Sequence, residues 1–238
     1  RYASDLESWS DACSARAPEG TTRMLRLYTY YRSSAAFRVR IALHYKGLAY
    51  QAIPVHLLRG GGEQHSAAFG ERNPARLIPV LEDGAFALTQ SLAIIEYLEE
   101  THPTPALLPA DAAARALVRS LALSIACDIH PLNNARVLRY LKAPLGIDEE
   151  RRAEWSRHWI ALGFAALERV LAQGGTAGAC CYGDTPTLAD CCLIPQVFNA
   201  QRVNCPLEPF PTIWGIYQHC MRQDAFARAA PAAQSDAE

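Results

Sequence analysis

One feature constrains the fold more than any other: the hydrophobic period changes once, at a proline-rich break in the middle of the chain. Before the break, short stretches with the two-residue alternation of strands are interspersed with helical stretches. Pro103, Pro105 and Pro109 then fall close together, which indicates a linker. After it, every periodic segment repeats at three or four residues, as amphipathic helices do. The pattern predicts a small α/β domain followed by an all-helical domain.

The first half predicts a mixed sheet. Strand-like and helix-like stretches follow in the order β-α-β and then β-β-α, within about 80 residues. Gly47 closes the first helix, and Pro54 suggests that the second strand lies at an edge, since proline cannot donate to a neighbouring strand. The expected strands are residues 25–30, 48–57, 77–81 and 86–88, with a turn at 82–85, and the expected helices are 35–46 and 89–100.

The second half predicts helices only. Apolar residues recur every three or four positions in residues 118–129 and again in 155–170. Thr187 and Asp190 have the spacing of a capping box, and Pro195 is expected to kink the helix that starts there. We therefore expect a helical domain over residues 110–238, after an α/β domain over residues 24–104.

Charge and composition exclude several classes of function. The 23 Lys and Arg residues nearly balance the 24 Asp and Glu residues, so the net charge of −1 gives no support to a nucleic-acid or membrane partner. No apolar run reaches the roughly 20 residues that cross a bilayer. We expect a soluble, cytoplasmic protein.

The eight cysteines predict neither a metal site nor a redox motif. None of them forms a C-x-x-C pair, which is the spacing of zinc ribbons and dithiol reductases. A chain of 238 residues also does not need disulfides to stabilise its fold. Small buried thiols in a reducing cytoplasm are the better interpretation.

Residues 1–23 differ from the rest of the chain. They are polar and lack the apolar core of a secretory signal. Met24 directly precedes the first alternating segment, so we interpret Met24 as the natural start and residues 1–23 as a dispensable extension.

Five blocks in collinear order resemble the zeta class of glutathione transferases. The first, SSAAFRVRIAL, is similar to the class signature SSCxWRVRIAL, with Ala35 in place of the cysteine. The resemblance extends roughly from Met24 to Ala232. The blocks are Ser33–Leu43, Asn73–Pro74 with Ile78–Leu81, Gln90–Glu100, Asp128–Asn134 and Pro195–Arg202.

This resemblance implies the glutathione transferase fold: a thioredoxin-like domain that binds glutathione, a helical bundle that supplies the pocket for a second substrate, and a homodimer. The best-known activity of the class is the isomerisation of maleylacetoacetate to fumarylacetoacetate in tyrosine breakdown. Three alternatives stay open: isomerisation of maleylpyruvate, transfer of glutathione to α-haloacids, and a binding module without turnover.

The isomerisation explains why a thiol cofactor is expected. A cis double bond must become single before it can rotate, and a thiolate that adds to the conjugated alkene and then leaves allows this. Only the thiolate is a good nucleophile, and a thiol with a pKa near ~8.5 needs help at neutral pH. Glutathione would return unchanged.

The resemblance places the hydroxyl that stabilises the thiolate at Ser33. This residue follows a strand and begins a helix, where N–H groups and the helix dipole favour an anion. The local residues alone favour a helix cap formed by Ser33 or Ser34, and the full motif reverses that preference. Ala35 removes a cysteine from the pocket, which puts any cysteine-assisted role in doubt.

Ser34 and further residues are expected to bind glutathione, as Ser33 is. Ile78 precedes Pro79, and the resemblance implies a cis bond there that exposes the Ile78 backbone for pairing with the tripeptide. Gln90 and Ser91, at a helix N-terminus, would bind the γ-glutamyl carboxylate. Gln64 matches a position that contacts the glycyl end, and a solvated loop glutamine is its alternative.

The second substrate is expected to be a small dicarboxylate. Arg202 matches an arginine that holds a carboxylate, which suits its planar fork, and Arg38 is a weaker candidate. A surface pair with Glu208 is the alternative for Arg202. His130 and Asn134 match the pocket-lining stretch of the class and are expected to bind substrate without catalysing the reaction.

Overall fold

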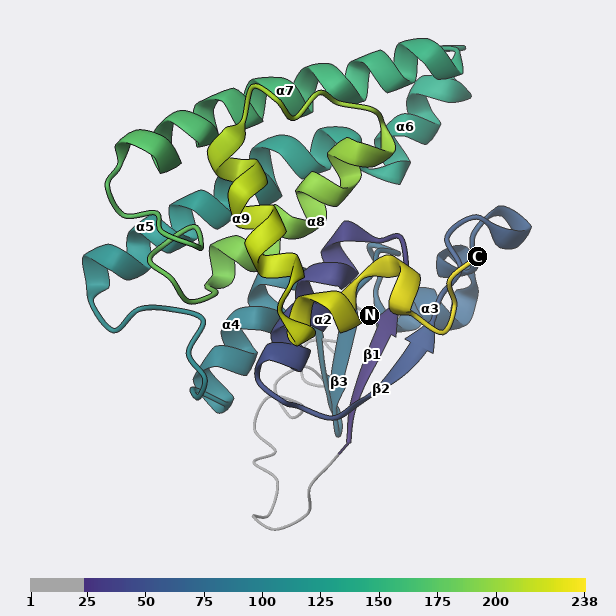
Figure 1. Ribbon diagram of the computed structural model, residues 1–238. Helices are drawn as coiled ribbons and strands as arrows, with labels where there is room; N and C mark the ends of the chain where they lie inside the picture. Colours follow the sequence, from purple (N-terminus) through teal and green to yellow (C-terminus); the bar gives the residue numbers. More distant parts are fainter. Residues whose placement is uncertain (1–23) are drawn as a thin grey trace, which may run out of the picture.

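Four strands form one mixed sheet in the order β2-β1-β3-β4 (Figure 1). The computed structural model describes residues 24–238, so the interpretation of residues 1–23 lies outside the described residues. The central strand β1 pairs in parallel with β2 and antiparallel with β3. The predicted mixed sheet is confirmed, with Pro54 on an edge strand. The strands are β1 Leu25–Thr29, β2 Tyr50–Pro54, β3 Val80–Asp83 and β4 Phe86–Thr89.

Several strand boundaries differ from the prediction: β2 is shorter than the expected residues 48–57, β1 and β4 differ by one residue at their ends, and β3 changes at both ends. β3 begins at Val80 rather than at residue 77, because Pro79 has no N–H to pair across the sheet. The same strand continues to Asp83, which pairs with Phe86 in β4. The turn therefore shrinks to two residues, and Gly84 takes the positive φ of 63° that such a tight hairpin requires.

Three helices accompany the sheet: α2 Ser34–Tyr45, α3 Ala67–Arg72 and α4 Ser91–Thr101. α2 is buried from Ala36 to Leu43, because α4 and two helices of the second half pack around it. The short α3 was not predicted, since six residues show no clear helical period. α2 and α4 begin close to the predicted positions, and both N-termini carry candidate glutathione ligands.

The second half is helical throughout, as predicted, and lies on the α2 side of the sheet (Figure 1). Asp190 Oδ2 accepts the Thr187 N–H at 2.8 Å, which confirms the capping box, and α8 continues through Pro195 as one helix. No helix in residues 24–238 is long and apolar enough to span a membrane. The helices are α5 Ala112–Leu123, α6 Ala135–Lys142, α7 Glu149–Gln173, α8 Leu188–Arg202, α9 Pro211–Met221 and α10 Asp224–Ala229.

Residues 118–129 keep a helical spacing of apolar residues, although their backbone is not α-helical throughout. α5 ends at Leu123, a π-helical turn spans Ser124–Ile129, and a 3₁₀ turn spans His130–Asn133. Such π-turns are frequent at functional sites because they redirect side chains. Here the two turns lead the chain from α5 to the start of α6.

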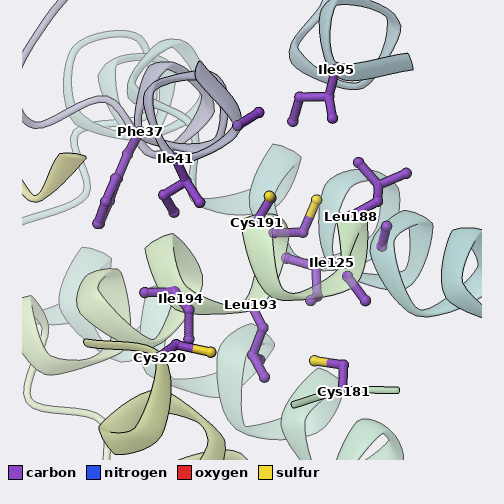
Figure 2. Packing of buried hydrophobic residues seen from close by; sticks show 14 of the residues in the cluster. Phe37, Ile41, Ile95, Ile125, Cys181, Leu188, Cys191, Leu193, Ile194 and Cys220 are labelled. Carbon is purple, nitrogen blue, oxygen red and sulfur yellow. The ribbon is translucent and has the colours of Figure 1, made fainter. Parts of the chain in front are cut away.

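One continuous hydrophobic core joins the two halves. In Figure 2, Phe37 and Ile41 point from α2 toward α8, and Ile95 of α4 points toward Leu188 and Cys191 at the start of α8. All five side chains are almost fully buried. The halves are therefore packed as a unit, which holds opposite walls of any site between them at a fixed separation.

A buried ion pair anchors the predicted linker. Lys46 Nζ lies 2.7 Å from Glu99 Oε2 and also donates to the carbonyl oxygens of His102 and Pro105. Glu99 accepts two further N–H bonds from residues 107–108. The proline-rich segment is thus fixed to the first domain rather than free.

A second ion pair joins α4 to α5, and it is partly exposed. Arg119 donates to both carboxylate oxygens of Glu96, at 2.6 and 2.7 Å. We expect Arg119→Ala to lower the free energy of unfolding by about 0.5–1 kcal/mol in urea titrations, because solvent weakens such pairs. High salt should reduce the loss. Arg169→Ala, an exposed arginine on α7, is the control, and an equal loss in both variants would contradict a specific contribution of this pair.

Candidate active site

A cavity of about 450 Å³ opens between the two halves. Its walls come from the turn after β1, the loop before α3, the segment before β3, the start of α6 and the end of α8. The structure brings seven of the sequence-predicted site residues together here, and leaves three out of the lining. The seven are Ser33, Ser34, Gln64, Ile78, His130, Asn134 and Arg202, and the three are Arg38, Gln90 and Ser91.

Ser33 is the N-cap of α2, and it lines the cavity. Its Oγ accepts the Ala36 N–H at 3.2 Å, so the hydroxyl proton can be donated to a ligand. The turn that carries it is held from below by buried Arg40, which donates to Thr29 Oγ1 at 2.9 Å and to the carbonyl oxygen of Tyr31 at 3.1 Å. The Ser33 side chain can therefore cap the helix and donate a hydrogen bond to a ligand at the same time. It does so at the positive end of the helix dipole.

Ser34 and Ala35 follow Ser33 in the cavity wall. Ala35 presents a methyl group at the position of the cysteine in the class signature. No cysteine lines the cavity in the described part of the chain. Any nucleophilic thiol in this cavity must therefore come from a bound ligand.

Gln64 and Ile78 face the cavity from the N-terminal domain. Gln64 is 6% exposed, and its Oε1 has no hydrogen-bond partner. The Ile78–Pro79 bond is cis, as the resemblance implies. An unpartnered amide oxygen in a buried side chain is costly, which indicates that a ligand belongs beside Gln64.

Gln90 and Ser91 lie at the N-terminus of α4, outside the residues that line the cavity. Gln90 has a positive φ of 69°, and Ser91 is buried. The first N–H groups of the helix have no partner within it, so this end suits a carboxylate. Binding of the γ-glutamyl carboxylate there stays a prediction.

Binding of the substrate by Arg38, the weaker candidate, stays a prediction. Arg38 is 2% exposed, does not line the cavity, and donates to Ser91 Oγ at 3.3 Å. Its Nε and Nη2 are buried without a hydrogen-bond partner in the described residues, and its charge acts on His130 in the cavity wall. Arg38 thus fixes the Ser91 hydroxyl.

Arg202 and Arg32 bring two positive charges to the cavity. Burial, and then the nearby charge of Arg32, lowers the pKa of Arg202. Neither guanidinium forms an ion pair within residues 24–238, so the alternative pair of Arg202 with Glu208 is not present. Two unpaired guanidinium groups favour an anionic ligand.

His130 and Asn134 line the opposite wall. Burial, and then the charge of Arg38, lowers the pKa of His130 to about 3, so the imidazole is neutral at physiological pH. Asn134 caps α6 by accepting the Arg136 N–H at 3.0 Å. Both residues therefore offer neutral polar groups, in agreement with a binding role.

Sequence reasoning missed several polar residues of the cavity. Arg32 directly precedes Ser33, so its place in the same turn could have been predicted. Asn199 lies on α8 within the matched block Pro195–Arg202, and the rest lie in loops, turns or the short helix α6, whose packing the sequence does not show. The missed residues besides Arg32 are Tyr30, His65, Arg76, Asn133, Arg136, Arg139 and Asn199.

One group of buried side chains has the composition of a metal site, but it lies away from the cavity. Cys180, Asp190 and Cys220 bring their ligand atoms within 4.8 Å of one another. The Asp190 carboxylate already accepts hydrogen bonds from the N–H groups of Cys181 and Thr187. This carboxylate fixes the start of α8, and we assign the cluster to the fold.

Residues 27–106 match the family model described as glutathione S-transferase, N-terminal domain. The probable maleylacetoacetate isomerase of Vibrio cholerae is 53% identical over 90% of this chain and 98% of its own length. A maleylpyruvate isomerase described as a bacterial zeta-class glutathione S-transferase is 50% identical, covers 90% of this chain and all of its own, and superposes with a TM-score of 0.87. The chain belongs to the zeta class of glutathione transferases.

The match extends to a zeta-class structure with ligands. The maleylacetoacetate isomerase of Methylobacterium extorquens AM1, solved with malonate and glutathione, is 41% identical. It covers 90% of this chain and 99% of its own, with a TM-score of 0.86. Both halves of the zeta-class fold are therefore present in this chain, and the thioredoxin-like and helical architecture predicted from the sequence is confirmed.

Proposed function

We propose that this protein is a glutathione-dependent cis–trans isomerase that converts maleylacetoacetate to fumarylacetoacetate. One observation carries the proposal: the cavity combines the Ser33 hydroxyl, at a helix N-terminus, with the unpaired guanidinium groups of Arg32 and Arg202. The Ser33 hydroxyl suits a thiolate, and the two guanidinium groups suit a dicarboxylate. The zeta-class relatives are named for this isomerisation or for that of maleylpyruvate.

The residues present fit glutathione as the cofactor. Gln64 leaves a buried amide oxygen without a partner, and the N-terminus of α4 leaves N–H groups for a carboxylate. When bound, glutathione supplies a thiolate that adds to the cis double bond, allows rotation, and leaves unchanged. Ser33 donates a hydrogen bond that lowers the thiol pKa, and Arg202 with Arg32 holds the carboxylates of the substrate. His130 stays neutral, so its imidazole binds substrate without acting as a charged acid.

A second candidate is the isomerisation of maleylpyruvate. A 50% identical zeta-class protein is named for that reaction. We expect a homodimer in the cytoplasm on the resemblance to the class. Purified protein, assayed with glutathione and each maleyl compound in turn, separates the two substrates. We expect the higher kcat/KM with maleylacetoacetate, and a higher kcat/KM with maleylpyruvate would assign that reaction instead. Glutathione binding without turnover of either compound would favour a binding module.

A further inference from the structure

Side chains from both halves of the protein meet at one atom in the cavity wall. Arg139, on α6 of the helical domain, places Nη1 2.8 Å from Nε2 of His65 in the N-terminal domain. Gln64 places Nε2 3.1 Å from the same imidazole nitrogen. Both contacting groups are N–H donors, and the nitrogen offers a single lone pair. One imidazole nitrogen cannot satisfy both donors well, and the other acceptor near Gln64 Nε2, the Leu57 carbonyl oxygen, lies at 3.5 Å.

A second guanidinium lies beside this point. Arg76 Nη1 donates to the backbone carbonyl oxygen of His65 at 2.9 Å, and Arg76 also lines the cavity. Its backbone has a positive φ of 54°, a left-handed conformation that non-glycine residues rarely adopt and that is frequent at ligand sites. No Asp or Glu lines the cavity within residues 24–238. This end of the cavity therefore has an excess of donors and of positive charge.

The orientation in which glutathione binds indicates which of its carboxylates lies near Arg139. The inference therefore rests on the proposed function. In the proposed function the thiol of glutathione binds at Ser33, and its γ-glutamyl end binds toward the N-terminus of α4. The glycyl end then lies toward Gln64, whose buried side chain faces the cavity. A glycyl carboxylate at this position offers several lone pairs as hydrogen-bond acceptors, whereas His65 Nε2 offers one.

We infer that Arg139 reaches from the helical domain to bind the glycyl carboxylate of glutathione, together with Gln64. Both domains then contact the cofactor, one through Ser33 and α4 and the other through Arg139. The carboxylate replaces His65 as the acceptor for the guanidinium. Because Arg139 is exposed, solvent weakens the interaction, and we expect its loss to cost roughly 3- to 10-fold in affinity.

The test pairs a substitution in the protein with a matched change in the ligand. Isothermal titration measures the Kd of wild type and Arg139→Gln for glutathione and for glutathione amide, whose glycyl carboxylate is a neutral amide. We expect Arg139→Gln to weaken glutathione binding roughly 3- to 10-fold and to leave the Kd of the amide unchanged. Lys142→Gln, an exposed cation on the same helix outside the cavity, should change neither Kd.

The outcomes separate this inference from the proposed function. If Arg139→Gln weakens both ligands equally, or neither, Arg139 does not bind the glycyl carboxylate, while the proposed function stands. Absence of glutathione binding to the wild type would overturn both. Arg139→Lys should recover part of the affinity for glutathione alone, and melting temperatures close to wild type for all variants exclude loss of folding.

Discussion

Ser33→Ala is expected to lower kcat/KM for the maleyl substrate about 10²–10³-fold, the usual cost of one donor to a developing anion. The Kd for glutathione should change little, because the hydroxyl stabilises the thiolate more than the thiol. Ultraviolet titration of bound glutathione should show that its thiol pKa rises in the variant. The backbone N–H groups at the start of α2 supply the stabilisation that remains.

The substitution also removes a helix cap, since Ser33 Oγ accepts the Ala36 N–H. We expect a loss of about 1 kcal/mol in the free energy of unfolding from this contact. Ser66→Ala is the matched control, because Ser66 caps α3 in the same way and does not line the cavity. It should lose similar stability and keep its kcat. If Ser33→Ala also keeps its rate and the thiol pKa, Ser33 is a cap and nothing more.

Arg202→Ala is expected to raise KM for the maleyl substrate while the pKa of the bound thiol stays unchanged. A charge-assisted hydrogen bond contributes about 1.5–3 kcal/mol, which corresponds to a loss of roughly 10- to 150-fold in kcat/KM. Arg202 forms no ion pair within residues 24–238, so its removal should leave the melting temperature nearly unchanged.

Arg202→Lys should recover only part of the loss, because an ammonium group lacks the planar fork that binds a carboxylate at two points. Glu208→Ala is the matched control, since it removes the acidic residue that sequence analysis offered as an alternative partner. We expect it to leave kcat/KM unchanged. A normal kcat/KM in Arg202→Ala would remove Arg202 from the substrate site.

The fold was predictable because local patterns and the class motifs agree. The alternation of residues 25–30, the edge proline Pro54 and the capping box of Thr187 with Asp190 all correspond to observed elements. Local signals failed where the backbone departs from a regular period. The π-turn at Ser124–Ile129 keeps the apolar spacing of an α-helix, and α3 is too short to show one.

The place of a residue in the cavity wall was predictable where a motif carries it, as for Ser33, Ile78 and Arg202. Arg38 belongs to a matched block as well, but it lies outside the residues that line the cavity and donates to Ser91 Oγ, so its role stays a prediction. Arg139 shows the opposite case, since nothing in its local sequence indicates that α6 packs close to the loop of His65. Contacts between distant segments depend on how the helices pack, which residue patterns do not specify.

The central claim is that this cavity activates glutathione as a catalyst rather than as a consumed substrate. The most direct measurement mixes enzyme with a small amount of glutathione and a large excess of maleylacetoacetate, and follows the product together with free thiol. We expect complete conversion to fumarylacetoacetate, recovery of all thiol at the end, and no enzymic conversion without glutathione. Conversion that stops after one equivalent of glutathione, with the thiol trapped as a stable conjugate, would contradict it, as would an equal rate when glutathione is left out.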